Sequence, residues 1–393
     1  MADTCDVLVI GCGAIGAATA YYLSKAGMKV IAVDRGDVAS GTSSACDGNV
    51  LVVDKQPGFD AKMAYKSQEL YKTLQDELSF DFEYRQLGSV LAVENQTQVD
   101  LALEWVKLLA DSGIAVRYIG HPDVHQYEPK ISGDIVGLVE CDSDSSLNPI
   151  ALVYAYVNAA RKKGAMFKPL IEVNCLLKDR SGRIAGADTS AGRILAPNIV
   201  LAAGVWTPAI ARTCGIDVPI KPRKGHILVA ERTFGVGTRK VQEFGYLMAK
   251  FSQASKRDVE PEMDRYGIAM VFEPTPHGNF LIGSSREFAG FDTTCSMKVL
   301  ELLARRALRF FPCIRDVRVI RAYAGLRPYT PDHLPIISDV ELVPGLYIAA
   351  GHEGDGIGLA PITGVLVSAM LAGNAPVIPL EPLKLSRFSS VKA

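Results

Sequence analysis

The residues most able to do chemistry stand near the start of the chain, in the glycine-rich segment 11–16 with the sequence GCGAIG. A G-x-G-x-x-G turn between a strand and a helix binds the phosphates of a dinucleotide. Gly11 would make the tight turn, Gly13 would let the backbone approach a pyrophosphate, and Gly16 would let the helix pack against the strand. The free N–H groups at the helix start and the helix dipole would then attract the anion.

A strand, a helix and a second strand must surround this turn to position it. Residues 6–10 form a short apolar run rich in β-branched side chains, which is typical of a buried parallel strand. Residues 17–25 have the composition of a helix that ends at Gly27, and residues 29–33 predict the next strand. Asp34 closes that strand, where a carboxylate accepts hydrogen bonds from ribose hydroxyls. This context favours dinucleotide binding over a chance turn.

A second segment of small hydroxyl residues and glycines covers positions 37–49. Thr42, Ser43 and Ser44 offer hydrogen-bond donors, and Gly41 and Gly48 permit close approach of the backbone. Taken alone, the segment predicts a flexible surface loop or a phosphate-contacting loop equally well. The preceding motif favours the phosphate-contacting loop.

The C-terminal part of the chain repeats the order of strand, glycine-rich turn and helix. Residues 347–350 predict a buried strand, the run 351–358 (GHEGDGIG) predicts a turn, and residues 359–371 predict a helix. The start of this helix would stabilise negative charge on a reduced ring system. A strand at 198–202 that ends in Ala203 and Gly204 predicts another close approach at the carboxyl edge of the same sheet.

The remaining segments predict an α/β protein with two domains. The predicted helices cover residues 59–78, 96–113, 148–163 and 297–311. The predicted strands cover residues 88–93, 116–118, a pair within 164–173, another pair within 194–201, and residues 226–229, 266–272, 279–282 and 317–321. We expect a cofactor domain from residues 1–83, 141–222 and 323–393, and a substrate domain with a largely antiparallel sheet from residues 84–140 and 223–322.

Composition excludes several classes of function. The 393 residues include 42 Lys and Arg against 43 Asp and Glu, so no basic field is available for nucleic acid or an anionic membrane. We expect no membrane-spanning run, because charges interrupt every apolar stretch, and no signal peptide, so the predicted location is cytoplasmic.

The eight cysteines show no C-x-x-C pair and no spacing typical of zinc or iron–sulfur ligands. We expect buried free thiols in a reducing compartment, no metal site, and no relay within this chain that passes electrons onward.

Five separated segments together resemble the D-amino-acid oxidase-like flavoproteins, which include glycine oxidase, sarcosine oxidase and the dye-linked proline and opine dehydrogenases. The matching segments are residues 11–16, 41–44, 201–206, 325–328 and 351–358. Residues 278–288 and 351–363 further resemble the β subunits of dye-linked proline, hydroxyproline and opine dehydrogenases. The resemblance implies a glutathione-reductase-type flavoprotein fold with a Rossmann-like domain that binds FAD rather than NAD.

The resemblance also implies roles for individual residues. Arg327 stands where related enzymes bind the substrate carboxylate, and His352 and Glu353 are candidates for tuning the flavin or accepting an amine proton. Val173 matches the residue whose backbone meets the adenine, and residues 354–358 would offer N–H groups to the flavin N1/O2 edge. The full set expected at the cofactor is Gly11, Cys12, Gly13, Ala14, Ile15, Gly16, Asp34, Arg35, Gly41, Thr42, Ser43, Ser44, Gly48, Asn49, Val173, Ala203, Gly204, Trp206, Gly325, Arg327, Gly351, His352, Glu353, Gly354, Asp355, Gly356, Ile357 and Gly358.

Two positions depart from the relatives. Arg321 stands near the place of the cysteine that attaches the flavin in monomeric sarcosine oxidase, so the resemblance implies non-covalent FAD. Val271 stands near the place of the substrate-pocket tyrosine of glycine oxidase, which argues against glycine as the substrate.

The implied reaction is oxidation of the C–N bond of an amino or imino acid by hydride transfer to flavin N5. The electrons would pass to another subunit or a carrier, with a peripheral link to membrane electron transport. An oxidase that releases hydrogen peroxide, and a non-catalytic flavin-binding scaffold subunit, are the alternatives.

Overall fold

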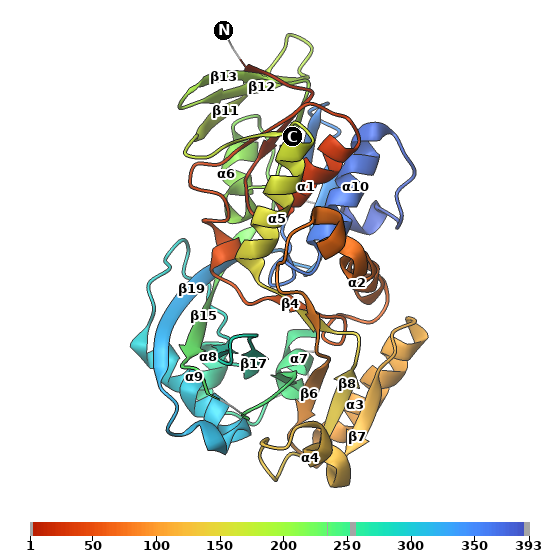
Figure 1. Cartoon of the computed structure of the whole chain (residues 1–393). Coiled ribbons are helices and arrows are strands. Elements are labelled where there is room, and N and C mark those ends of the chain that lie inside the picture. Colours follow the sequence, from red (N-terminus) through yellow and green to blue (C-terminus); the bar gives the residue numbers. More distant parts are fainter. Residues whose placement is uncertain (1–2, 234, 252–256, 389–393) are drawn as a thin grey trace.

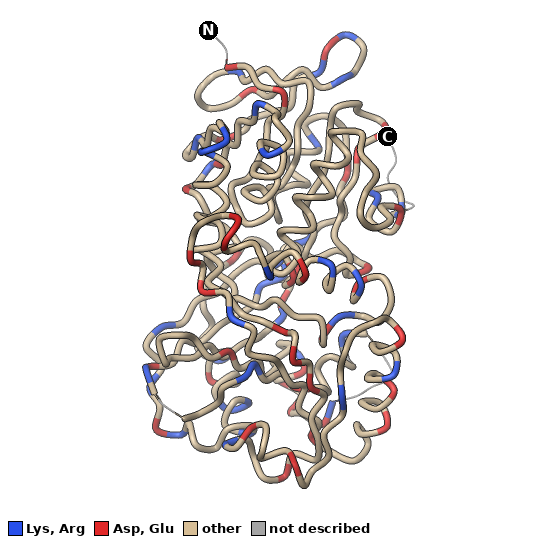
Figure 2. The backbone as a smooth tube through the Cα atoms, turned by 45° about the vertical axis from the view of Figure 1, so that its right-hand side comes forward, with Lys and Arg blue, Asp and Glu red and all other residues tan. Residues whose placement is uncertain are grey.

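The computed structural model describes residues 3–233, 235–251 and 257–388 (Figure 1). Its upper part in Figure 1 is built on a six-stranded sheet, and its lower part on an eight-stranded sheet. Basic and acidic residues are interspersed along both parts, as Figure 2 shows. Within the described ranges, no helix is both long and apolar enough to cross a membrane.

The six-stranded sheet holds the predicted opening strands at its centre. Its order is β10 (Met166–Lys168), β3 (Val30–Val33), β2 (Val7–Ile10), β14 (Asn198–Leu201), β21 (Leu346–Ala350) and β20 (Ile336–Asp339). Neighbouring strands are parallel except β20, which is antiparallel to β21. Every residue of β2 and β3 is buried, as expected for strands covered on both faces.

Alternate residues of β2 enter two different cores. Val7 and Val9 face the first core, with the helices α1 (Ala14–Lys25), α2 (Phe59–Leu78), α5 (Pro149–Lys162) and α10 (Ala360–Ala372). Leu8 and Ile10 face the second core, with α6 (Thr207–Arg212) and a four-stranded sheet. That sheet has the order β1 (Asp3–Thr4), β13 (Gly192–Leu195), β12 (Ile184–Thr189) and β11 (Val173–Lys178).

Close packing fixes α1 against α10. Gly364 of α10 lies directly over α1, where a Cβ atom would come within 2.5 Å of the Tyr22 ring and 2.9 Å of the Ala18 carbonyl oxygen. The absence of a side chain at Gly364 therefore sets the distance between the two helices that start at the glycine-rich turns.

The eight-stranded sheet is largely antiparallel, as predicted. Its order is β19 (Val319–Tyr329), β15 (Lys221–Ala230), β18 (Phe280–Gly283), β17 (Val271–Pro274), β16 (Lys240–Glu243), β6 (Ser89–Val93), β8 (Gly137–Cys141) and β7 (Arg117–Gly120), and only β16 and β6 are parallel neighbours. A third core includes residues of this sheet and of α4 (Val124–Tyr127), α8 (Pro261–Arg265) and α9 (Met297–Phe310). The helices α3 (Gln96–Asp111) and α7 (Phe244–Phe251) pack beside β6.

A small three-stranded sheet lies between the two parts, with the order β4 (Asn49–Val50), β9 (Ser145–Ser146) and β5 (Arg85–Gln86) (Figure 1). Short 3-10 helices cover Thr42–Ser44 (η1), His121–Asp123, Gly204–Trp206, Pro312–Ile314, Glu381–Leu383 and Leu385–Arg387.

The predicted helices are confirmed to within a few residues, whereas three strand predictions are wrong. The expected pair within 164–173 is one strand in each of two sheets, because the chain turns at Pro169 and Leu170, which has a φ of 60°. The pair expected within 194–201 is likewise one strand in each of two sheets, β13 and β14, with Pro197 between them. Residues 266–270 are not a strand, because Gly267 makes a turn with a φ of 54° after α8.

The eight cysteines are free, as expected, but only Cys5, Cys12, Cys141 and Cys214 are buried. Cys46, Cys175 and Cys295 are partly buried, and Cys313 is exposed. The division into two domains stays a prediction. Its expected boundaries at 222/223 and 322/323 fall inside β15 and β19, which pair with each other from Lys221 to Ala230.

We predict that Gly364→Val lowers the free energy of unfolding by about 1–3 kcal/mol, because the added side chain must push α1 away from α10. The midpoint of urea unfolding, followed by circular dichroism at equal flavin loading, measures the loss. Gly120→Val is the matched control, since a Cβ atom there meets only Pro122 at 3.9 Å. Equal midpoints for the two variants would contradict this account of the helix contact.

Candidate functional site

A cavity of about 650 Å³ lies at the carboxyl ends of β2, β3, β14 and β21. These strands are parallel, so their carboxyl ends meet at one edge of the sheet, where ligands of doubly wound folds bind. The glycine-rich segments from both ends of the chain therefore line the same cavity.

The first glycine-rich turn has the backbone that only glycine permits. Gly11 has a φ of 113°, and a Cβ atom on Gly16 would lie 1.9 Å from the Gly11 carbonyl oxygen. The Ala14 N–H donates to Ser43 Oγ at 2.9 Å, whereas the Gly13 N–H has no partner in the described part of the chain. This N–H group and the start of α1 face the cavity and are available to an anion.

Asp34 links this turn to the end of β3. Its two carboxylate oxygens accept hydrogen bonds from the Cys12 N–H at 2.7 Å and from the Gly36 N–H at 2.9 Å. Beside it, the Arg35 guanidinium lies 4.2 Å from the centre of a Trp206 ring. Asp34 is thereby held at the cavity wall, with further acceptor capacity on each oxygen.

The hydroxyl-rich segment packs against the eight-stranded sheet rather than forming a free surface loop. Thr42 Oγ1 donates to the Leu326 carbonyl oxygen at 2.7 Å. A Cβ atom on Gly325 would lie 2.2 Å from the Ala45 carbonyl oxygen, so β19 and this segment touch through backbone atoms. Gly41, Thr42 and Ser43 consequently line the cavity at a fixed place.

The second glycine-rich turn presents a row of backbone donors. Among the described residues, nothing accepts a hydrogen bond from the N–H groups of Gly354, Gly356, Ile357 and Gly358. The turn leads into α10, whose N-cap residue provides no side-chain hydrogen bond. Unsatisfied N–H groups at a helix start are suited to an anionic ring edge.

The two residues of this turn that were predicted to tune the flavin or accept a proton, His352 and Glu353, already contact other protein groups. His352 is buried, its Nε2 lies 3.0 Å from Thr363 Oγ1, and burial lowers its pKa to about 3. Glu353 has a φ of 48°, and its Oε1 lies 2.9 Å from Arg223 Nη2 and 3.1 Å from His333 Nδ1. Burial alone would raise the pKa of Glu353, but the His333 hydrogen bond and the Arg223 charge lower it to about 2. At neutral pH, His352 is therefore uncharged and Glu353 is a paired anion.

A second cavity, of about 80 Å³, adjoins the first. Four residues line both cavities: Asp47, Arg327, Glu353 and Gly354. The Arg327 guanidinium donates to the Ser285 carbonyl oxygen at 2.9 Å and to Ser284 Oγ. Both acceptors are neutral, so Arg327 keeps its positive charge uncompensated by these two bonds.

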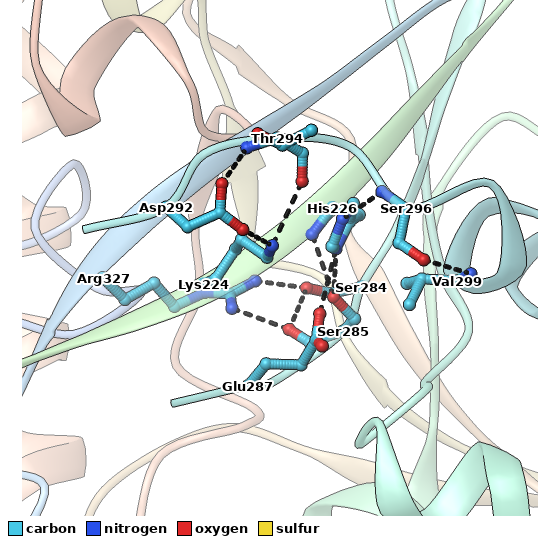
Figure 3. A network of polar contacts seen from close by, with 10 residues as sticks. All are labelled: Lys224, His226, Ser284, Ser285, Glu287, Asp292, Thr294, Ser296, Val299 and Arg327. Atoms are coloured by element: carbon cyan, nitrogen blue, oxygen red, sulfur yellow. Dashed lines mark hydrogen bonds and ion pairs between the residues drawn. The ribbon is translucent and has the colours of Figure 1, made fainter. Parts of the chain in front are cut away.

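The acceptors of Arg327 belong to a loop that β15 anchors, as Figure 3 shows. His226 Nε2 accepts from the Ser296 N–H at 3.2 Å, which leaves the proton on Nδ1, 2.8 Å from Ser285 Oγ. Burial and the Lys224 charge lower the pKa of His226 to about 4, so the ring stays neutral in this role. Lys224 Nζ also donates to Asp292 at 2.7 Å, so the loop is tied to β15 at several points.

Most of the predicted cofactor residues lie at one of the two cavities. Those at the larger cavity are Gly11, Gly13, Ala14, Ile15, Asp34, Arg35, Gly41, Thr42, Ser43, Val173, Ala203, Gly204, Trp206, Gly325, Arg327, Gly351, His352, Glu353, Gly354, Gly356 and Ile357. Asn49, Asp355 and Gly358 line the smaller cavity instead.

Four predicted cofactor residues line neither cavity: Cys12, Gly16, Ser44 and Gly48. Cys12 and Gly16 pack behind the turn. Ser44 Oγ donates to the Gly41 carbonyl oxygen at 3.1 Å within its own segment. Gly48 is required by packing, since a Cβ atom there would lie 1.8 Å from the Leu147 carbonyl oxygen.

Sequence reasoning missed the polar residues of the smaller cavity, chiefly Arg223, Tyr246 and Arg286. A signal for Arg223 exists in the sequence. Arg223 precedes Gly225 by two positions, and Arg327 follows Gly325 by two positions. Antiparallel pairing of the two glycines therefore places the two arginines opposite each other, as the structure does.

The larger cavity fits a flavin dinucleotide. Backbone donors at two helix starts face it from opposite ends of the chain, and Asp34 stands where a ribose acceptor is needed. Comparison with known proteins agrees. The model of the DAO family, described as FAD dependent oxidoreductase, matches residues 6–370.

Relatives match over nearly the whole chain. The HcnC chain of hydrogen cyanide synthase from Pseudomonas protegens, which is named as a subunit, is 29% identical, over 98% of this chain and 96% of its own. A protein of Rhizobium meliloti that is named as a subunit of opine oxidase is 26% identical, over 99% of both chains. The crystal structure of glycine oxidase from Geobacillus kaustophilus shares the fold, with a TM-score of 0.88 at 24% identity, over 98% of this chain and 99% of its own. The family match extends from β2 into α10 and so covers most of the chain. This chain therefore belongs to the DAO family of FAD-dependent oxidoreductases.

Proposed function

We propose that the protein oxidises the C–N bond of an amino or imino acid with a secondary amine, such as proline, hydroxyproline or an opine, and passes the electrons to a partner chain or carrier. The observation that carries this proposal is the position of Arg327. Its guanidinium lies where the two cavities meet and is held by neutral acceptors, so its charge is free for a substrate carboxylate. The name of the relative from Rhizobium meliloti, an opine oxidase, supports a substrate of this class.

In this proposal, the two glycine-rich turns and Asp34 would hold the cofactor. FAD, when bound, supplies the two-electron acceptor for the substrate. Gly13 and the start of α1 would hold its pyrophosphate, Asp34 a ribose, and the N–H groups of Gly354 and Gly356 the flavin ring edge. Arg321 is exposed and lines neither cavity, so its identity gives no support to non-covalent binding, which stays a prediction.

Arg327 would bind the substrate carboxylate through its planar pair of N–H groups and so orient the C–H bond. The hypothesis that His352 or Glu353 accepts a proton receives no support from their contacts, since Thr363, Arg223 and His333 occupy them. We propose instead that both residues fix the second glycine-rich turn.

Two relatives carry the word subunit in their names, which supports a partner chain as the electron acceptor. Glycine oxidase among the related folds supports the second candidate, an oxidase that donates electrons to oxygen. The cytoplasmic location stays a prediction.

The proposal predicts that the purified protein is yellow and that at least one secondary amino acid bleaches its flavin without oxygen. Proline, hydroxyproline, sarcosine, an opine and glycine form the test panel, followed by visible absorbance. If no member of the panel bleaches a fully loaded protein, the catalytic role is wrong and a non-catalytic flavin-binding scaffold takes its place.

The acceptor is tested with the substrate that bleaches the flavin. We expect the rate of reduction of an artificial dye under air to exceed the rate of hydrogen peroxide formation, because the proposed electron acceptor is a protein partner or carrier and not oxygen. A peroxide yield equal to substrate consumed would favour the oxidase.

Arg327→Met is expected to lower kcat/KM for carboxylate substrates by about 100-fold or more, roughly 3 kcal/mol, while FAD stays bound. Loss of the charge-assisted bonds to the carboxylate causes the effect. Arg321→Met is the matched control, since Arg321 lies on the same strand, is exposed and lines neither cavity. Equal kinetics for the two variants would remove Arg327 from the substrate site.

A further inference from the structure

We propose that the substrate carries a second carboxylate, which Arg223 and Arg286 bind in the smaller cavity while Arg327 binds the first. The inference rests on the proposed function and narrows it to secondary amines with two carboxylates. It starts from an excess of positive charge in the smaller cavity that the described residues leave unbalanced.

Two of the three guanidiniums come from directly opposed positions of one antiparallel strand pair. Arg223 of β15 is the register partner of Arg327 of β19. Opposed residues project to the same face of a sheet, and both of these line the smaller cavity. Two like charges at opposed positions destabilise a sheet unless an anion lies between them.

The third guanidinium belongs to Arg286, on the loop that follows β18. It stacks on the Tyr246 ring, with its carbon 4.1 Å from the ring centre. Within residues 3–233, 235–251 and 257–388, its guanidinium makes no hydrogen bond or ion pair, and its Nε is buried without a partner. The ring holds the guanidinium in one place and leaves its edge N–H groups to a ligand.

The acidic residues that line the smaller cavity do not balance its basic residues: Asp47, Asp54, Glu353 and Asp355 stand against Lys55, Arg223, Lys240, Lys250, Arg286 and Arg327. Arg223 has one ion pair, to Glu353, and its buried Nε and Nη2 have no aligned hydrogen-bond acceptor in the described structure. Glu353 in turn is shared with His333. Asp355, which also lines the cavity, is taken by Lys55 at 2.7 Å. Three guanidiniums therefore face one contacting carboxylate.

A ligand with two negative charges matches that excess. Burial of an uncompensated cation is unfavourable, and each unpaired donor adds to the penalty. A substrate with one carboxylate would satisfy Arg327 and leave Arg223 and Arg286 short of acceptors. The free volume of about 80 Å³ suits a short carboxylate-bearing arm.

Iminodiacetate and sarcosine test the inference, since they share the secondary amine and the first carboxylate and only iminodiacetate has the second. With the FAD-loaded protein under anaerobic conditions, we expect kcat/KM for flavin bleaching to be about 100-fold higher for iminodiacetate. Arg286→Gln should reduce this preference at least tenfold. Arg286→Lys, which keeps the charge, should retain more of the preference than Arg286→Gln, and exposed Arg315→Gln, outside both cavities, should retain all of it.

A binding measurement separates failure of this inference from failure of the proposed function. Glutarate has the chain length of iminodiacetate but no amine to oxidise, and butyrate lacks its second carboxylate. We expect glutarate to perturb the flavin spectrum with a Kd at least tenfold below that of butyrate, and Arg286→Gln to abolish the difference.

Equal Kd values for glutarate and butyrate, together with equal bleaching by iminodiacetate and sarcosine, would overturn the second-carboxylate site and leave the proposed oxidation intact. If glutarate binds more tightly than butyrate and this difference depends on Arg286, the second-carboxylate site is supported. If, in addition, no amino acid bleaches the flavin, the proposed oxidation is wrong.

Discussion

The contact between α1 and α10 is the constraint on which the rest of the structure depends. Both helices start at a glycine-rich turn after a parallel strand, and β14 separates these two strands in the sheet. Gly364 lets the helices approach until the Tyr22 ring touches the glycine backbone. Two helix starts from opposite ends of the chain are thereby held at one cavity, where their unpaired N–H groups are available to one ligand.

The second organising feature is electrostatic and lies where the two sheets meet. The pairing of β15 with β19 brings Arg223 and Arg327 together, and Glu353 reaches Arg223 from the second glycine-rich turn. The ion pair of Glu353 with Arg223 therefore joins the second glycine-rich turn to the wall of the smaller cavity. It also accounts for the left-handed backbone of Glu353, since the pair and His333 hold that residue in place.

The sequence predicted the cofactor side of the site far better than the substrate side, for a physical reason. A turn such as that at Gly11 needs a backbone that other residues avoid, so its glycines remain visible in the sequence. The role of Arg286 depends on Tyr246 and on the cations around it, which only strand register and loop packing bring together. The prediction for Gly48 also fails because it depends on tertiary packing. Gly48 lines neither cavity and instead lets the backbone pack against Leu147.

The loop after β18 has a consequence for how such enzymes diverge. Its residues Ser284, Ser285 and Arg286 touch or form the cluster of guanidiniums, while Lys224 and His226 of β15 secure it from outside the flavin cleft. Under the proposed function, Arg286 on this loop would bind the substrate, whereas the two glycine-rich turns would hold the nucleotide. Under the proposed function, exchange of this loop between family members would change the contact made by Arg286 and leave the two glycine-rich turns as they are.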